Sequence, residues 1–272
     1  MCSSSSSQHD LASTRHAASL ASVYRLVDRQ LSPLGLRAMN VLDPRRGDTV
    51  LDVGCGAGGT LHQLSERIGP KGRVIGVDIA PALVSIAEER CKDDPSIELI
   101  RADAQTLAMQ TGCLDRIYSR FGVMGFANPT AAFGNFRRLL RPGARLAFCC
   151  WRTFEENELD YFPVKAAGRI HDVRETPFSF SDPSAVRFLL ENTGFTQIAF
   201  EAFDANVSCG DLNATVEVLL SVGALGQIVR EKTAHRSEVE PLLREALAAR
   251  SDTAHVELKA AVWIVSAHAD RS

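Results

Sequence analysis

The residues with the clearest chemical potential form a glycine-rich turn at 50–59, which reads Val-Leu-Asp-Val-Gly-Cys-Gly-Ala-Gly-Gly. An apolar run leads into this turn, and apolar residues at helical spacing follow it. Glycines permit positive φ angles and let a ligand approach the backbone, while the start of a helix presents free N–H groups. The pattern predicts a ligand-binding turn between a strand and a helix.

Two ligand classes fit such a turn. Gly54, Gly56 and Gly59 satisfy the G-x-G-x-x-G spacing of dinucleotide-binding turns, which predicts an NAD-dependent reductase. Asp52 favours the second class, because its carboxylate would repel a pyrophosphate and would suit a sulfonium or a cationic amino group. Asp78 ends the next apolar run and could accept a ribose diol in either class. We therefore favour S-adenosylmethionine (SAM) and keep the dinucleotide as the alternative.

The elements that position this turn follow a strand–helix alternation. The predicted strands are the apolar runs at 49–53, 73–78, 97–100, 114–119 and 144–151. The predicted helices between them cover 59–68, 81–91 and 129–140. Short apolar strands that alternate with helices form mainly parallel sheets, and right-handed crossovers place helices on both faces. The sequence thus predicts an α/β fold.

The segments outside this alternation need separate interpretations. Residues 1–18 are Ser-rich and are predicted to be a flexible tail. Residues 19–42 have apolar groups at helical spacing, but Pro33 and Gly35 interrupt them, so we predict two short helices. Residues 152–182 break the rhythm and are interpreted as an insertion. The remaining predicted elements are a helix at 183–192, a strand at 195–202, a helical stretch at 211–249 and an apolar strand at 257–266.

Composition excludes several function classes. The 272 residues are 45% hydrophobic and 23% charged, as in an ordinary globular protein. The formal net charge of -3 disfavours nonspecific binding to nucleic acid, which depends on clustered Lys and Arg. No apolar run is long enough to span a membrane, and the first residues lack the pattern of a secretory signal. The seven cysteines are odd in number and contain no C-x-x-C pair, which favours reduced thiols over a zinc site. We expect a cytoplasmic protein without a metal or a nucleic-acid partner.

Several motifs in order carry a family resemblance that covers 48–151 and, more weakly, 178–267. They read V-L-D-V-G-C-G-A-G-G, V-I-G-V-D-I-A, I-R-A-D-A, D-R-I-Y-S-R-F-G-V-M-G-F-A-N-P and N-F-R-R-L-L-R-P-G-A-R-L. The sequence resembles the class I SAM-dependent methyltransferases. The S-R-F-G-V-M run and the late Trp151 look like bacterial small-molecule members of the ubiquinone-type group.

The resemblance implies a fold and a division of the chain. The fold would be a Rossmann-like, seven-stranded, mostly parallel sheet in the order 3-2-1-4-5-7-6, with helices on both faces, N-terminal helices and an insertion after strand 5. A single methyltransferase domain would cover 19–272. Its parts would be an N-terminal helical cap at 19–47, a SAM-binding core at 48–151, and acceptor-side insertions at 152–182 and 203–252.

The resemblance also implies roles for individual cofactor-binding residues. Gly54, Cys55 and Gly56 would pack against the methionyl group, and Asp52 would orient the loop or bind the amino group through water. Asp78 would hold the ribose hydroxyls, and Ile79 would lie against the adenine. Asp103 would accept the adenine amino group and Ala104 N–H would meet a ring nitrogen, although Asp103 could instead cap the following helical turn. Ser119 and Arg120 would lie beside the methionine carboxylate and the methyl group.

The methyl acceptor is predicted only by class. Its pocket should lie at the carboxyl ends of the strands, where aromatic side chains favour a small apolar or aromatic molecule. The candidate pocket residues are Tyr24, Phe121, Met124, Phe126, Trp151 and Tyr161. His171 is the candidate general base, although surface placement is the alternative. A methyltransferase that acts on RNA or protein, and a non-catalytic binding protein with this fold, remain alternatives, and the sequence does not determine the methylated atom or the oligomeric state.

Overall fold

The computed structural model describes residues 3–173, 178–231, 235–250 and 252–270. Their contacts divide the chain into two compact units. The sheet unit comprises Ser32–Thr153, Phe178–Ala205 and Ala261–Ser272, and the helical unit comprises Met1–Leu31, Phe154–Pro177 and Asn206–Ala260. Each unit is described by itself.

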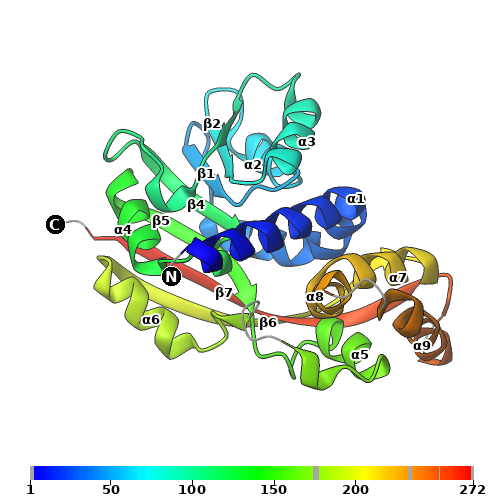
Figure 1. Cartoon of the computed structure of the whole chain (residues 1–272). Coiled ribbons are helices and arrows are strands. Elements are labelled where there is room, and N and C mark those ends of the chain that lie inside the picture. Colours follow the sequence, from blue (N-terminus) through cyan, green and yellow to red (C-terminus); the bar gives the residue numbers. More distant parts are fainter. Residues whose placement is uncertain (1–2, 174–177, 232–234, 251, 271–272) are drawn as a thin grey trace. The chain divides into compact units, whose positions relative to one another are not determined.

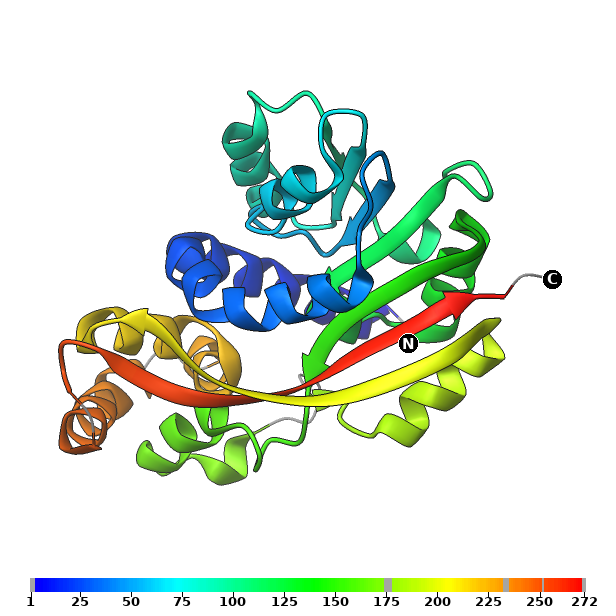
Figure 2. The ribbon, with the colours of Figure 1, turned by 180° about the vertical axis from the view of Figure 1, so that it is seen from behind.

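A seven-stranded sheet has the order β3-β2-β1-β4-β5-β7-β6, which confirms the predicted fold. The strands are β1 (Thr49–Val53), β2 (Arg73–Asp78), β3 (Ile97–Arg101), β4 (Leu114–Arg120), β5 (Leu140–Trp151), β6 (Phe195–Gly210) and β7 (Val256–Ala269). The pairs that β1 to β5 form are parallel, and β7 runs antiparallel to β5. Figures 1 and 2 show the strands from opposite sides. Residues 206–210 of β6 and 256–260 of β7 belong to the helical unit.

Helices cover both faces of the strands in the sheet unit. They are α2 (Leu61–Ile68), α3 (Pro81–Cys91), α4 (Pro129–Leu139) and α6 (Pro183–Asn192), with the short turns η1 (Ala104–Thr106) and η2 (Gly122–Gly125). Three of these helices begin at a proline, whose fixed φ suits the first helical position. Asn128 and Asp182 cap α4 and α6 by accepting a backbone N–H.

The alternation of side chains along β1 separates the two faces. Leu51 and Val53 pack in one core cluster with Phe133 and Phe136 of α4. The intervening Asp52 points to the opposite face, where its side chain accepts a hydrogen bond from Thr60 just before α2. The strand register aligns Val53 with Val77 and Asp52 with Tyr118. The carboxyl ends of β1, β2 and β4 therefore meet at one edge of the sheet.

The N-terminal segment differs from the prediction of a tail followed by two short helices. A single helix, α1, runs from Ser3 to Leu42 and contains Pro33. Proline removes one helical hydrogen bond, but its fixed φ is itself helical. Among the residues that follow it, Leu34, Met39 and Leu42 are fully buried, and the Tyr118 hydroxyl donates to the Gly35 carbonyl at 2.9 Å. This packing offsets the local preference for a break.

The helical unit brings together segments that the sequence suggested were separate insertions into one domain. It contains α5 (Glu158–Ala166), η3 (Ile170–Asp172), α7 (Leu212–Ser221), α8 (Gly223–Glu231) and α9 (His235–Arg250). The predicted helical stretch at 211–249 is thus three helices, and α5 packs against α8 and α9. A small core joins Val23 and Val27 of α1 to Cys209 and Val218. The two units arise because these distant segments contact one another.

Asp160 gives the helical unit a predicted pH dependence. Its buried carboxylate accepts the Ala224 N–H at 2.7 Å at the start of α8. Burial raises the pKa of Asp160 to about 6, so the folded chain binds a proton more tightly than the unfolded chain. This contribution to stability is present at low pH and is lost as pH rises from about 4 to about 6.

Asp160→Asn is expected to keep the hydrogen-bond acceptor without the buried charge. We expect the variant to gain up to roughly 3 kcal/mol of unfolding free energy relative to wild type at pH 8, and little at pH 4. Urea denaturation of both proteins at the two pH values measures this difference. An equal difference at both pH values would contradict the role of the charge.

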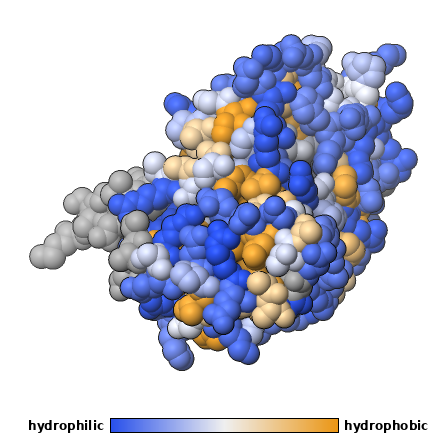
Figure 3. Space-filling view, turned by 90° about the vertical axis from the view of Figure 1, so that its right-hand side faces the viewer, coloured by the Kyte–Doolittle hydropathy of each residue, from blue (hydrophilic) through white to orange (hydrophobic). Residues whose placement is uncertain are grey.

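Hydrophilic side chains dominate the surface that Figure 3 shows, and hydrophobic residues occur there in small groups. The large hydrophobic residues that are exposed among the described side chains are Ile79, Ile170, Phe188 and Leu242. In the described part of the chain, no single helix has the length and apolarity to cross a membrane, and α7 with α8 passes that test only as a pair bent by 59°.

Candidate functional site

The glycine loop after β1 uses most of its own N–H groups internally. Gly54 and Gly56 have φ angles of 68° and 55°, which only glycine adopts readily. The N–H groups of Gly54 and Cys55 both donate to the Val77 carbonyl, at 2.9 and 3.1 Å, and Gly58 N–H donates to the Cys55 carbonyl. Burial raises the pKa of the Cys55 thiol. The thiol therefore stays protonated and neutral. The two hydrogen bonds to Val77 hold the loop against β2.

Asp78, at the end of β2, completes the loop. One carboxylate oxygen accepts Gly56 N–H at 2.9 Å, and the other accepts Ala80 N–H at 2.8 Å. Burial raises the pKa of Asp78, and these backbone N–H groups oppose that rise by stabilising the charged form. A carboxylate has about four acceptor sites, so acceptor capacity remains for a hydroxyl donor. The adjacent Ile79 is 61% exposed, which places an apolar side chain beside this carboxylate.

Asp52 is directed at the helix rather than at solvent. The residue is 1% exposed, and its carboxylate accepts the Thr60 hydroxyl at the start of α2. A negative charge at that position interacts favourably with the helix N-terminus. Of the two roles that the resemblance implies for Asp52, this contact corresponds to loop orientation. Thr60 is a loop-ordering residue that no local pattern singles out, because its partner Asp52 is eight positions away.

The loop geometry disfavours a diphosphate. Diphosphate-binding turns present unpaired N–H groups at a helix N-terminus. Here the N–H groups of Gly54, Cys55, Gly56 and Gly58 donate to protein oxygens, and the Asp52 carboxylate adds negative charge beside α2. The arrangement instead suits a ligand that carries a diol and a positive charge.

Asp103 and Ala104 lie after β3, at η1. The Asp103 carboxylate accepts two hydrogen bonds from Gln105, at 2.9 Å from the backbone and 2.8 Å from the side chain. It therefore caps the turn, as the alternative interpretation of Asp103 predicted, and a second lone pair on each oxygen remains for a ligand. Asn135 of α4 fixes the turn by donating to the carbonyls of Ala104 and Leu107.

Ser119 joins the glycine loop to the turn after β4. Its hydroxyl donates to the Val53 carbonyl at 2.8 Å and accepts Gly122 N–H at 3.1 Å. The residue is fully buried, so its hydroxyl orders the two backbones. Gly122 packs directly on Gly54, because a Cβ built on Gly122 would lie 2.8 Å from the Gly54 Cα. Gly122 was not among the predicted site residues, although its place in the S-R-F-G-V-M run was a signal.

Arg120 extends from the end of β4 towards α1. Its Cδ lies 2.8 Å from the position of a Cβ built on Gly35. A side chain on Gly35 would therefore collide with the Arg120 stem. This contact gives a packing reason for the glycine that interrupts the helical pattern of α1.

Comparison with known proteins relates this chain to a protein family. A family model described as a methyltransferase domain matches residues 50–143. The chain is 26% identical over 188 residues to the demethylmenaquinone methyltransferase of Staphylococcus carnosus, covering 63% of this chain and 78% of the relative. It is 30% identical over 119 residues to the aklanonic acid methyltransferase DauC of Streptomyces sp., covering 43% and 54%.

This chain belongs to the class I SAM-dependent methyltransferases. The fold agrees, because the YcgJ protein of Bacillus subtilis superposes with a TM-score of 0.58 at 16% identity, over 88% of the methyltransferase and 98% of that chain. A 37.1 kDa protein in transposon Tn4556 of Streptomyces fradiae is 37% identical over 108 residues, which is 40% of this chain. The methyltransferase spans 31% of the length of that relative, and 54% of DauC.

The predicted acceptor residues of the methyltransferase divide between the two units. In the sheet unit, the rings of Phe121 and Trp151 stack with centroids 4.0 Å apart, while Met124 and Phe126 pack against the core. The helical unit contains the other two pocket candidates, Tyr24 and Tyr161, and the candidate general base His171. Tyr24 accepts a hydrogen bond from the Arg25 guanidinium, Tyr161 packs edge-on against Phe154, and His171 is exposed on η3.

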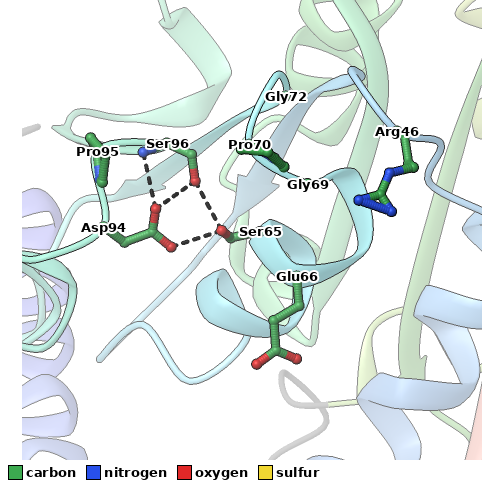
Figure 4. A pocket seen from close by; sticks show the side chains of 9 residues that line it. All are labelled: Arg46, Ser65, Glu66, Gly69, Pro70, Gly72, Asp94, Pro95 and Ser96. Carbon is green, nitrogen blue, oxygen red and sulfur yellow. Dashed lines mark hydrogen bonds between the residues drawn. The ribbon is translucent and has the colours of Figure 1, made fainter.

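A surface pocket of about 550 Å³ lies at the other edge of the methyltransferase sheet. Its residues precede β2 and β3, whereas the loop residues described above follow strands. In Figure 4, Asp94 links Ser65 and Ser96 by hydrogen bonds. His62 lies 3.7 Å from Asp94 and contacts the Arg90 carbonyl. Because Ser65 donates to Asp94 rather than to His62, these side chains do not form a serine–histidine relay.

Proposed function

We propose that this methyltransferase binds SAM at the carboxyl edge of β1, β2 and β4 and transfers its methyl group to a small apolar or aromatic molecule. The observation that carries the proposal is the Asp78 carboxylate, which holds Gly56 and Ala80 N–H and keeps lone pairs beside the exposed Ile79. A carboxylate next to an apolar side chain suits a ribose diol joined to a flat base.

The residues fit the cofactor through complementary chemistry. Gly54, Cys55 and Gly56 offer a backbone surface without bulky side chains for the methionyl group. Asp78 accepts the ribose hydroxyls, and Ile79 covers one face of the adenine. Asp103 and Ala104 N–H form hydrogen bonds with the edge of the adenine. Ser119 and Arg120 lie beside the methionine part of the cofactor.

The chain contributes mainly alignment to the reaction. When bound, SAM supplies a methyl group that is already activated on a sulfonium. The protein holds donor and acceptor in line and excludes water, and such alignment can lower the barrier by roughly 7–11 kcal/mol. A general base is required only for an acceptor whose attacking atom carries a proton. His171 stays the candidate for that role, on the sequence evidence alone.

The names of the relatives support a small-molecule acceptor. They include methyltransferases named for demethylmenaquinone, aklanonic acid and nocamycin. The arginines of α4 and β5 support the same class, because they are engaged within the sheet unit. Arg137 donates to the Gly194 and Asp270 carbonyls, Arg138 to the Leu107 and Met109 carbonyls, and Arg145 to the Val41 carbonyl. Such arginines stabilise the fold rather than form an open patch for RNA.

Calorimetry and a transfer assay test the proposal together. We expect the full chain to bind S-adenosylhomocysteine, and to transfer label from methyl-labelled SAM to a member of a panel of quinols, phenols and aromatic carboxylates. Titration with NADH is the matched comparison, and we expect no binding. Binding of NADH without binding of S-adenosylhomocysteine would overturn the assignment. Transfer to tRNA or protein alone would overturn the acceptor class.

A further inference from the structure

Phe121 adopts a backbone conformation that is rare for a large side chain. Its φ is 65°, in the left-handed region, where a bulky residue is a genuine outlier. The Phe121 N–H donates to the Cys149 carbonyl at 3.1 Å, which anchors the outlier to the end of β5. Backbone strain of this kind concentrates at functional sites, where the surrounding structure maintains it.

The ring of Phe121 stacks on Trp151. The centroids are 4.0 Å apart and the planes are inclined by 21°. Both residues are half-buried, and the core cluster that contains Cys150 includes neither of them. Both residues therefore keep some accessible surface.

The pair adjoins the glycine loop through the backbone. Phe121 directly precedes Gly122, whose Cα packs on Gly54. Trp151 shares a sheet face with Cys149, whereas Cys150 points into the core cluster on the other face. In β1, Asp52 alternates with Leu51 and Val53 of that cluster, so Asp52 and Trp151 lie on the same side of the sheet.

We propose that the stacked Phe121–Trp151 pair is the specificity-determining wall for the methyl acceptor and selects a flat conjugated ring. This inference rests on the proposed function. A conjugated ring can extend the stack by offset or edge contacts, while a saturated ring of the same skeleton cannot. The strained turn holds the wall next to the loop where the methyl donor is proposed to bind.

Two probes with one skeleton test the proposal. 2-Naphthol is flat and trans-decahydro-2-naphthol is saturated, and each is titrated by calorimetry into protein saturated with S-adenosylhomocysteine. We expect wild type to bind 2-naphthol more tightly by roughly 3- to 10-fold, as one aromatic stack predicts. Wild-type protein that binds neither probe, or binds both equally, would overturn the proposal.

Two variants test whether the preference for 2-naphthol depends on the Phe121–Trp151 pair. Phe121→Gly removes the ring while glycine accepts the positive φ, and Trp151→Leu keeps an apolar side chain without the stack. We expect both to lose the preference and to keep wild-type affinity for S-adenosylhomocysteine within about threefold. Phe188→Ala, at an exposed phenylalanine on α6, is the control and should keep the preference.

The outcomes separate this proposal from the proposed function. A preference that survives in Phe121→Gly and Trp151→Leu would overturn the wall. Failure of wild type to bind S-adenosylhomocysteine would instead overturn the function. Circular dichroism identifies a variant that does not fold, and the other variant then decides.

Discussion

Asp78→Ala is expected to reduce the affinity for S-adenosylhomocysteine by at least roughly 100-fold, because hydrogen bonds to a charged group contribute about 1.5–3 kcal/mol each. The substitution removes the proposed ribose acceptor. It also removes the acceptor for Gly56 and Ala80 N–H, which order the loop. Both effects weaken the binding of S-adenosylhomocysteine, so the loss of affinity should exceed that of an ordinary surface substitution.

Calorimetry on wild type and two further variants checks this result. Asp78→Asn keeps carbonyl acceptance without the charge, and we expect an intermediate affinity. Asp93→Ala, in the exposed turn after α3, is the matched control and should bind as wild type does. Unchanged affinity in Asp78→Ala would remove the assignment of this carboxylate to the cofactor.

Gly122→Ala is expected to reduce the same affinity by roughly 10- to 100-fold, in line with the cost of forcing a methyl group into a closely packed position. A Cβ on Gly122 would lie 2.4 Å from the Val53 carbonyl oxygen and 2.8 Å from the Gly54 Cα. Both neighbours are backbone atoms, so a side-chain rotation cannot relieve the overlap. Either the glycine loop or the turn that carries Gly122 must move.

Gly125→Ala is the matched control, because it lies in the same short helical turn and a Cβ there has no neighbour within 4 Å in the described structure. We expect it to bind S-adenosylhomocysteine normally, with circular dichroism confirming that both variants fold. Normal binding by Gly122→Ala would show that the contact between the two turns does not shape the cofactor site.

The loop and the end of β2 could be predicted because local chemistry restricts their residue types. The positive φ angles of Gly54 and Gly56 require glycine, and a carboxylate such as Asp78 at a strand end is visible as a pattern. The proposed roles of Ile79, Asp103 and Arg120 came from the family resemblance. Those roles stay predictions that titration of variants with S-adenosylhomocysteine can test.

The structure differs from the sequence-based predictions where residues far apart in the chain contact one another. Pro33 and Gly35 indicated a break in the N-terminal helix, but the burial of Leu34 and Met39 sustains one helix. The two predicted insertions form one unit, because α5 packs against helices that lie about fifty or more residues later.

The amino-acid sequence alone indicated the strand–helix alternation and the glycine loop, because residue periodicity and strand-end chemistry are local properties that spacing records. The order of the strands was implied by the family resemblance. Only the tertiary structure decided that Gly122 meets Gly54, that Ser119 ties their backbones together and that Phe121 stacks on Trp151. These contacts depend on the pairing of β1 with β4 and of β4 with β5. Strand pairing joins residues that are far apart in the chain, and the spacing of a single sequence does not record which of them meet.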